Sequence, residues 1–374
     1  MSLKEIFCQD RAIMLLQRAL AAERISHAYI FAGGEGIGKF KTACEWARLL
    51  LCEKPTVDGA GQSQFADSCG SCKSCKLFDA GSHPDFNHIY KELREFTKDG
   101  KGKPPPVDMP IDVIREFVIA KAPMRPTHSA KKVFIVSEAE KLNASSQNCL
   151  LKILEEPPEY CCIILICTRL DKLLPTTRSR CQIVRFGPVA EERIIEKLVQ
   201  DGAEQNQATY FARLSQGSLG LACRFAELER AGAGLYQIKK DVVAALTVCR
   251  LADSVELAEN LSKNSKEIST AWSELEKTTS KTDISRRAAK VLIYMVASVF
   301  NDLMKMSVVP KGDIVNFDQQ RDIRKLTERM DAEQAAQRIT DCYRMLNWIE
   351  SNVNEKLIFE QLLLNMTHSD RMTA

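Results

Sequence analysis

A glycine-rich segment near the N-terminus has the residue types and the spacing of a phosphate-binding loop. Residues 33–39 read Gly-Gly-Glu-Gly-Ile-Gly-Lys, which is the pattern G-x-x-x-x-G-K. The segment lies between an apolar run that predicts a strand over 27–32 and a stretch that predicts a helix over 39–52. In that setting, backbone N–H groups and the helix N-terminus can bind phosphate oxygens, and the lysine can reach the outer phosphates. A glycine-rich turn without a ligand is the less favoured alternative. The candidate nucleotide-binding residues of this segment are Gly33, Gly36, Gly38, Lys39 and Phe40.

The residues expected to hold Mg²⁺ at such a site are missing. Phe40 stands where a serine or threonine hydroxyl is expected. Ser137 follows a predicted strand over 132–136, where an aspartate is expected, and Glu138 keeps the position of the water-activating carboxylate. Because Mg²⁺ offsets the charge that develops on a transferred phosphoryl group, losing both ligands predicts very slow hydrolysis or none. The loop can still hold a nucleotide.

A second candidate site is a group of cysteines. Cys69, Cys72 and Cys75 have the spacing C-x-x-C-x-x-C, and Cys52 stands upstream at the end of the predicted helix. Four thiolates can complete a tetrahedral Zn²⁺ site. An iron–sulfur cluster and a redox-active pair are alternatives, but a further cysteine before a proline and a thioredoxin-like context are both absent. The pattern predicts a structural zinc module over about 52–75.

Composition limits the classes of protein that need to be considered. The chain has 374 residues, 45% hydrophobic and 27% charged, with a formal net charge of +3. This charge lacks the strongly basic signature of a self-sufficient DNA-binding protein. Its longest uninterrupted apolar runs are shorter than the ~20 residues of a membrane span, so we expect a soluble, cytosolic chain of two or three domains.

The order of predicted elements indicates an α/β domain followed by helices. Predicted strands over 27–32, 132–136, 161–167 and 183–186 alternate with helical stretches, which favours a parallel sheet with helices on its faces. Strand signals stop after Pro188, and helical patterns fill the rest of the chain. They include an apolar stretch over 291–300 and the stripe of an amphipathic helix at Ile339, Tyr343, Leu346, Ile349 and Val353. Within the α/β part, Asn143 is a candidate cap of a helix over 142–155 that ends at Pro157 and Pro158.

Four motifs, in order, resemble the AAA+ module of the clamp-loader family of bacterial DNA polymerase III. They are His-Ala-Tyr-Ile-Phe-Ala-Gly at 27–33, Ser-Glu-Ala-Glu-Lys-Leu-Asn at 137–143, Leu-Leu-Lys-Ile-Leu-Glu-Glu-Pro-Pro at 150–158 and Lys-Leu-Leu-Pro-Thr-Thr-Arg-Ser-Arg-Cys at 172–181. The resemblance implies an AAA+ P-loop domain over 1–187 with the zinc module inserted. It also implies a small helical lid domain over 188–228 and an all-α collar domain over 229–374.

The resemblance also assigns roles to single residues. Arg180 is similar to the family's arginine finger, which projects into a neighbouring subunit's ATP site, and Thr168 matches the sensor-1 region. Gly220 stands where the ATPase subunits have a sensor-2 arginine. With Phe40 and Ser137, this is the pattern of a stator that contributes an arginine in trans and has no ATPase activity of its own.

The implied partners are gamma/tau-type and delta-type clamp-loader subunits, the sliding clamp, and primed DNA bound through the complex. The implied location is the cytoplasm, in association with the nucleoid. A catalytically active gamma-type ATPase with unusual metal ligands is the main alternative, and Phe40, Ser137 and Gly220 disfavour it. A stand-alone zinc-dependent nucleic-acid binder is a weaker alternative, which the near-neutral net charge disfavours.

Overall fold

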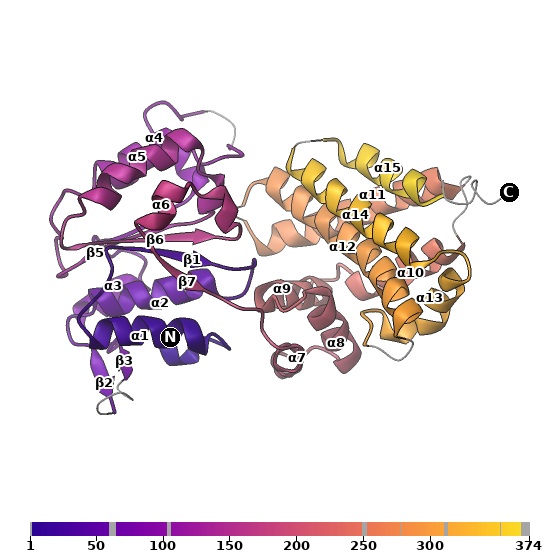
Figure 1. The fold of residues 1–374 in the computed structure, drawn as a ribbon, viewed down its shortest axis with the longest axis horizontal. Coiled ribbons are helices and arrows are strands. Elements are labelled where there is room, and N and C mark those ends of the chain that lie inside the picture. The colour runs from indigo at the N-terminus through magenta and orange to yellow at the C-terminus, as the bar shows by residue number, and fades with distance from the viewer. Residues whose placement is uncertain are drawn as a thin grey trace. The chain divides into compact units, whose positions relative to one another are not determined.

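The chain forms two compact units, Met1–Ala190 and Glu191–Ala374. A computed structural model describes residues 2–59, 65–102, 106–248, 253–277, 279–309, 313–351 and 353–367. The first unit is a sheet with helices on both faces, and the second is helical throughout the described residues (Figure 1). The α/β fold class predicted from the sequence is therefore confirmed.

Five parallel strands form the main sheet, in the order β4-β5-β6-β1-β7. They are β1 (Ala28–Ala32), β4 (Phe86–Ile89), β5 (Lys132–Val136), β6 (Cys161–Cys167) and β7 (Gln182–Arg185). Four of them agree with the predicted strands to within one residue at each end. The edge strand β4 was not predicted.

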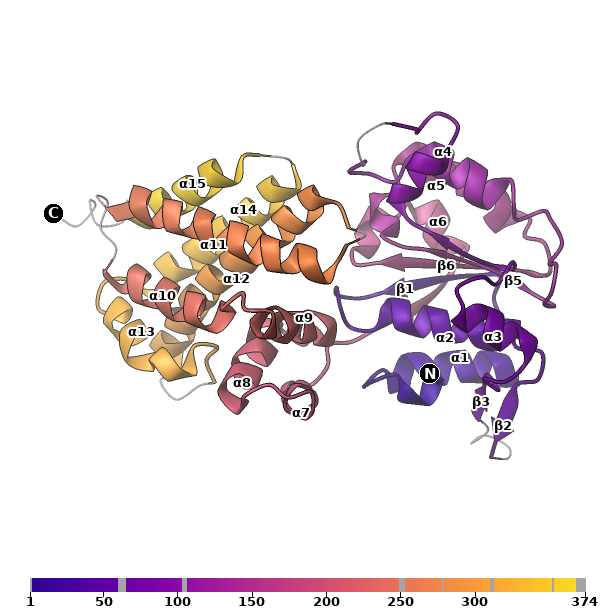
Figure 2. The ribbon, with the colours of Figure 1, turned by 180° about the vertical axis from the view of Figure 1, so that it is seen from behind.

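Helices cover the two faces of this sheet (Figures 1 and 2). One face carries α1 (Asp10–Ala21), α2 (Lys39–Leu51) and α3 (Lys73–Asp79), and the other carries α4 (Ile111–Ile114), α5 (Ala144–Glu155) and α6 (Pro175–Ser179). Side chains of β1 alternate between them: Tyr29 and Phe31 belong to the core that includes Trp46 of α2, and Ile30 belongs to the core that includes Leu150 of α5. Strands buried on both faces explain the continuous apolar runs in the sequence.

The predicted zinc module is a separate insertion after α2. It contains a short antiparallel hairpin, β2 (Thr56–Asp58) and β3 (Phe65–Asp67), followed by the cysteine loop and α3. The hairpin was not predicted.

Helix α5 begins and ends as its sequence indicates. The Asn143 side chain accepts a hydrogen bond from the Ser146 N–H at 2.8 Å, which confirms the expected N-cap. The helix stops at Glu155, two residues before Pro157 and Pro158. These ends place Glu155 at the last helical position.

Nine helices are described in the second unit. They are α7 (Glu191–Gln200), α8 (Gln205–Leu214), α9 (Leu219–Arg230), α10 (Leu235–Val248), α11 (Ser254–Leu275), α12 (Lys281–Val308), α13 (Gln320–Thr327), α14 (Ala332–Glu350) and α15 (Glu355–Thr367). The predicted lid–collar boundary falls in the last turn of α9, and the division of this unit into lid and collar stays a prediction.

Two long helices test the expected burial patterns. Helix α12 contains the predicted apolar stretch 291–300. The helix is long and apolar enough to cross a membrane, but 61% of its most apolar 18-residue segment is buried inside the protein, as expected for a core helix. In α14 the predicted stripe is wrong at Tyr343, which is 51% exposed, whereas Cys342 and Met345 are buried. The buried face of α14 is therefore rotated about the helix axis relative to the predicted stripe.

Candidate functional site

The phosphate-binding loop joins β1 to α2, and two of its glycines are required by the backbone. A Cβ atom at Gly33 would lie 2.6 Å from both the Phe186 carbonyl oxygen and the Ile37 Cδ1 atom. Gly38 has φ +100° and is the N-cap of α2, a conformation that other residues rarely adopt. The loop therefore directs the N-terminus of a 13-residue helix at the space in front of it.

Lys39 is 6% exposed and its ammonium group lies inside this loop. Its Nζ atom donates to the Gly33 carbonyl at 2.7 Å and to the Gly34 carbonyl. Because an ammonium group has three protons, one N–H remains available for a phosphate oxygen. Burial lowers the pKa of Lys39, and the nearby Glu140, Cys167 and Glu35 oppose that shift.

Aromatic rings occupy the side of the loop where metal ligands are expected. Phe40 is 44% exposed, and its ring packs on His88 of β4 with the ring centroids 4.7 Å apart. The His88 Nε2 atom hydrogen-bonds with the Ser137 hydroxyl at 2.9 Å, and Tyr90 packs against His88 with the centroids 5.0 Å apart. Burial lowers the pKa of His88 to about 4, so this imidazole is neutral at pH 7. Among the described residues, the groups on this side of the loop are thus the Phe40 ring, the His88 imidazole and the Ser137 hydroxyl.

Glu138 follows β5 in an unusual backbone conformation. Its φ of 51° and ψ of 46° lie in the left-handed region, which is sparsely populated by residues other than glycine and is enriched at functional sites. Its carboxylate lies 2.6 Å from the Lys141 Nζ atom and 3.9 Å from the Lys91 Nζ atom. Two lysines therefore neutralise the negative charge.

Thr168 lies at the same edge of the sheet, just after β6. Its hydroxyl donates to a Glu140 carboxylate oxygen at 2.5 Å. Glu140 follows β5, which neighbours β6, and β6 neighbours β1. The carboxyl ends of these three strands thus bring together the loop with Lys39, the Glu138–Glu140 segment and Thr168.

Arg180 makes its contacts with a different set of residues. It is the C-cap of α6, and its Nη1 group donates to the Thr176 carbonyl at 3.0 Å. Its Nη2 group lies 2.7 Å from a Glu155 carboxylate oxygen, and the arginine side chain remains 34% exposed. The guanidinium is therefore held in one orientation but is accessible from outside.

The four predicted metal-binding cysteines come together in the insertion. Their sulfur atoms all lie within 4.8 Å of one another, and Cys52 Sγ lies 3.6 Å from Cys69 Sγ and 3.9 Å from Cys72 Sγ. Sulfurs of a tetrahedral zinc site with Zn–S bonds of ~2.3 Å would be about 3.8 Å apart. Backbone N–H groups of Ser71 and Cys72 lower the pKa of Cys69 to about 6. The cluster can hold one metal ion through all four thiolates.

A buried hydrogen-bond network connects this cluster to the sheet. The Ser74 and Ser129 hydroxyls both donate to the Leu51 carbonyl, at 2.6 and 2.9 Å, next to Cys52. Both hydroxyl oxygens also contact the His83 Nε2 atom, at 2.8 and 3.2 Å. Each serine proton is already donated to Leu51, so His83 must donate from Nε2. The network joins the cysteine loop, α2 and the segment before β5.

Several of these residues were not found from the sequence. His88 was missed because β4 was not predicted, and Glu140 was treated only as part of a motif. Glu155 was also quoted only within its motif, since its pairing with Arg180 depends on how α5 and α6 pack. The His-Pro-Asp sequence at 83–85 was the available signal for the serine–histidine network.

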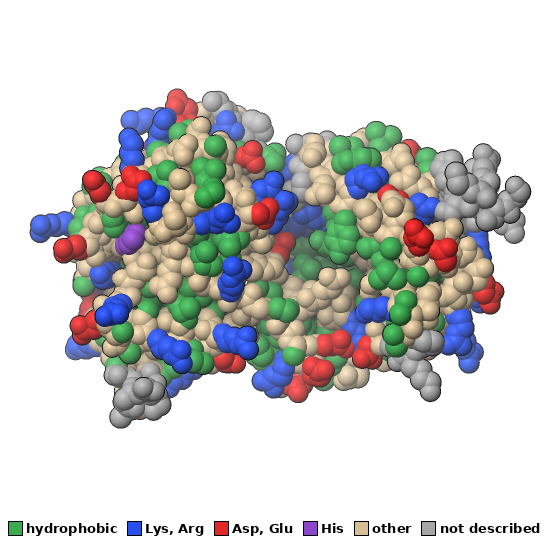
Figure 3. All heavy atoms as spheres, in the orientation of Figure 1, with side chains coloured by type: hydrophobic (Ala, Val, Ile, Leu, Met, Phe, Trp, Pro, Cys, Tyr) green, Lys and Arg blue, Asp and Glu red, His purple; other side chains and the backbone are tan. Residues whose placement is uncertain are grey.

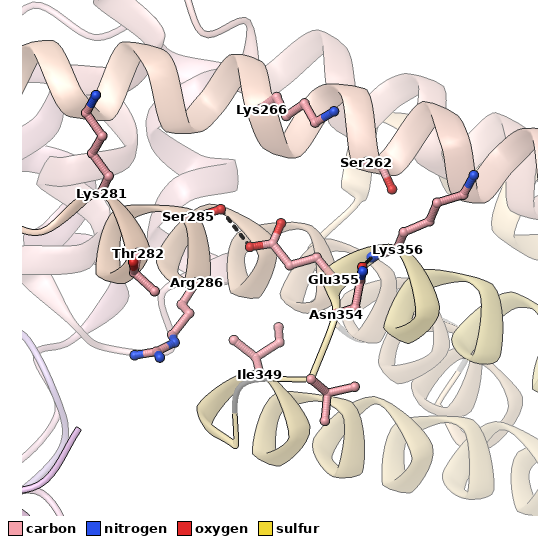
Figure 4. Close-up of a pocket in the computed structure, with 11 residues that line it drawn as sticks. Ser262, Lys266, Lys281, Thr282, Ser285, Arg286, Ile349, Asn354, Glu355 and Lys356 are labelled. Carbon is pink, nitrogen blue, oxygen red and sulfur yellow. Dashed lines mark hydrogen bonds between the residues drawn. The ribbon is translucent and has the colours of Figure 1, made fainter. Parts of the chain in front are cut away.

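A hollow of about 620 Å³ in the helical unit contains none of the predicted site residues. Its lining includes Lys266, Lys281, Arg286 and Lys356 (Figure 4). At its centre the Glu355 carboxylate accepts a hydrogen bond from the Ser285 hydroxyl at 2.6 Å. Elsewhere, basic and acidic side chains are interspersed over the face in view, consistent with the small net charge (Figure 3).

Comparisons with known proteins give a consistent group of relatives. The family model described as "DNA polymerase III, delta subunit" matches residues 8–190. The model described as "DNA polymerase III, delta subunit, C terminal" matches residues 250–368. The chain is 31% identical to DNA polymerase III subunit delta' of Bacillus subtilis over 222 residues, which is 59% of this chain and 59% of that protein.

Two further relatives come from the same polymerase. DNA polymerase III subunit delta' of Escherichia coli is 33% identical over 202 residues, 54% of each chain. Subunit tau of Bacillus subtilis is 31% identical over 195 residues, 52% of this chain and 31% of that protein. The matches to these two delta' subunits thus span a little over half of their length. A solved gamma subunit-related protein of Thermotoga maritima is 18% identical, with a TM-score of 0.45, over 95% of this chain and 99% of that one.

Proposed function

Since the chain belongs to the DNA polymerase III delta-subunit family, we propose that it works in a clamp loader as a delta-prime-like stator. In this role it does not hydrolyse ATP efficiently. It donates Arg180 to the ATP site of a neighbouring ATPase subunit while the complex loads a sliding clamp on primed DNA.

The observation that carries this proposal is the make-up of the loop's metal side. Phe40 packs on His88, and His88 hydrogen-bonds with Ser137, so neither position offers an oxygen ligand of the expected kind. The Glu138 carboxylate is engaged by Lys141 and Lys91, so it would have to leave these partners to orient a water molecule. Efficient phosphoryl transfer needs both the metal and an oriented water.

Arg180 supports the second half of the proposal. A guanidinium supplied in trans stabilises the charge of the transferring phosphoryl group, an effect of ~10³–10⁵ in rate in systems where it has been measured. Arg180 is held in place by Glu155 and Thr176 and is still one-third exposed. Such a side chain can face a second subunit without a large loss of conformational freedom.

The remaining parts of the proposal concern cofactors and partners. The four-cysteine cluster would hold Zn²⁺, whose role here is to fix the inserted module to the end of α2. The ring partners would be gamma/tau-type and delta-type subunits, with the helical unit forming the collar, in the cytoplasm near the nucleoid.

A gamma-type ATPase is the second candidate function, and one observation is compatible with it. The loop contains Gly33, Gly36 and Gly38 at positive φ, and Lys39 has one N–H left for a phosphate oxygen. This geometry supports nucleotide binding whether or not turnover follows.

Reconstitution with the ATPase subunits of the same organism tests the stator role. Replacing Arg180 by alanine should leave assembly intact and lower the ATP turnover of the complex by at least ~100-fold at the site it serves. Full activity of the Arg180→Ala complex would refute the proposal.

A further inference from the structure

We propose that Glu155 is a positioning residue for Arg180: it fixes the direction in which the guanidinium faces the phosphate-transfer site of the neighbouring subunit. This inference rests on the proposed function, because it assigns a second residue to the same trans site.

The contact is direct and selective. Glu155 Oε1 lies 2.7 Å from Arg180 Nη2, and the Thr176 carbonyl accepts from Nη1 at 3.0 Å. These two acceptors hold two terminal nitrogens of one rigid plane, so the plane cannot rotate freely about the end of the side chain. Thr176 lies on the same short helix as the arginine's own cap position, whereas Glu155 comes from α5.

The two contacts leave enough donors for an anion. A guanidinium has five N–H donors, and Glu155 and Thr176 use two of them. The Nε–H and one N–H on each terminal nitrogen remain. Phosphoryl oxygens can therefore be bound by a guanidinium that still keeps its contact with Glu155.

Helices α5 and α6 are connected by hydrogen bonds of their own. The Gln147 side chain of α5 donates to the Lys172 carbonyl at 3.2 Å and accepts from the Leu174 N–H at 2.7 Å. Leu174 is the residue just before α6, and Gln147 is buried. Glu155 and Arg180 thus belong to one connected frame, and the orientation that Glu155 imposes follows that frame.

The ion pair between Glu155 and Arg180 adds little to the stability of the fold. Both side chains are partly exposed, Arg180 at 34% and Glu155 at 49%, and exposed ion pairs contribute little to stability. A weak pair can nonetheless select one rotamer of a mobile side chain, and small displacements of a catalytic group carry large costs in rate. The effect is expected in turnover and not in folding.

The test is ATP turnover by a reconstituted complex that contains the full-length chain. Glu155→Ala should lower kcat roughly 10-fold with the KM for ATP unchanged, because the finger acts in the transition state. Glu155→Gln keeps an acceptor oxygen at the same place and should lose only about 3-fold. Glu196→Ala is the matched control, since Glu196 forms an exposed ion pair at 2.8 Å with Arg193, and it should change nothing.

Adding Arg180→Ala separates the two claims. If Glu155 acts through the arginine, the Arg180→Ala/Glu155→Ala double variant should be no slower than Arg180→Ala alone. If Arg180→Ala slows the complex but Glu155→Ala leaves kcat unchanged or raises it, the positioning role is refuted and the stator role stands. If Arg180→Ala itself has no effect, the proposed function fails and the positioning role fails with it.

Discussion

Replacing Asp85 by asparagine should destabilise the N-terminal unit strongly. The Asp85 side chain is completely buried just before β4. Its carboxylate accepts three backbone hydrogen bonds from the segment that leads into β5: the N–H of Thr127 at 2.6 Å, and the N–H groups of His128 and Ser129, both at 2.8 Å. Ser129 is also part of the network that reaches Cys52, so this carboxylate supports both the sheet edge and the cysteine module.

The cost follows from these contacts. An asparagine oxygen can keep the bonds to His128 and Ser129, but its NH₂ group would then face the Thr127 N–H. One buried N–H without an acceptor costs about 1–3 kcal/mol. Replacing a charged acceptor by a neutral one weakens the other two bonds by about 1 kcal/mol together. We expect a loss of about 2–4 kcal/mol, a large part of the ~5–15 kcal/mol that stabilises a typical domain.

Hydrogen exchange measured by mass spectrometry reports this unit separately from the helical one. Amides of β4 and β5 should exchange roughly 30- to 700-fold faster in Asp85→Asn, since each 1.4 kcal/mol is a factor of ten. Asp58→Asn is the control, because Asp58 is exposed and its ion pair with Lys4 is exposed as well. A change below 3-fold in Asp85→Asn would contradict the reasoning.

The same carboxylate predicts a pH dependence. Burial raises the pKa of Asp85, but the three backbone hydrogen bonds outweigh burial and hold the pKa below its usual value. A lowered pKa in the folded state gives stability that is present above the unfolded value of ~3.9 and is lost as the pH falls through the folded value. The difference between wild type and Asp85→Asn should therefore shrink below about pH 4.

Three further predictions concern the metal, a buried ion pair and a buried imidazole. The purified chain should contain about one zinc per molecule by elemental analysis, and a chelator should speed amide exchange in the cysteine loop; a chain without metal would contradict this. Asp318→Ala leaves the buried ammonium of Lys239, 1% exposed, without its partner and should cost about 3–5 kcal/mol in chemical denaturation. Most of that loss should return in Lys239→Met/Asp318→Ala, and equal stability of both variants would refute the pairing. Because the pKa of His88 is lowered to about 4 by burial, the unfolded chain takes up a proton first as the pH falls below ~6.5. Wild type should thus lose more stability between pH 6.5 and pH 4 than His88→Phe does.

Much of the sheet could be predicted because its strands are buried on both faces. Strand β6 reads as an uninterrupted apolar run, β5 does so after Lys132, and the ends of both strands were predicted correctly. Strand β4 has only four residues and contains Asn87 and His88, so it lacks such a run. Its position became clear only from its pairing with β5, a contact between segments more than 40 residues apart.

The residues of the candidate site also divide into those that the sequence predicted and those that it did not. Residues within one motif, such as the glycines and Lys39, or the closely spaced cysteines, were predicted from their spacing. Partners from other elements were not: His88 on Phe40, and Glu155 on Arg180, depend on tertiary packing that spacing does not encode. Tyr343 shows a related limit, since a helical stripe identifies a helix more securely than it identifies the buried face.

The most direct test of the central claim is Mg-ATP turnover by the purified chain alone, measured beside the Lys39→Ala variant. The stator account predicts no turnover above that control, with nucleotide binding to the loop still detectable. Turnover that disappears in Lys39→Ala would make the chain an ATPase and would contradict the role assigned to Phe40 and Ser137.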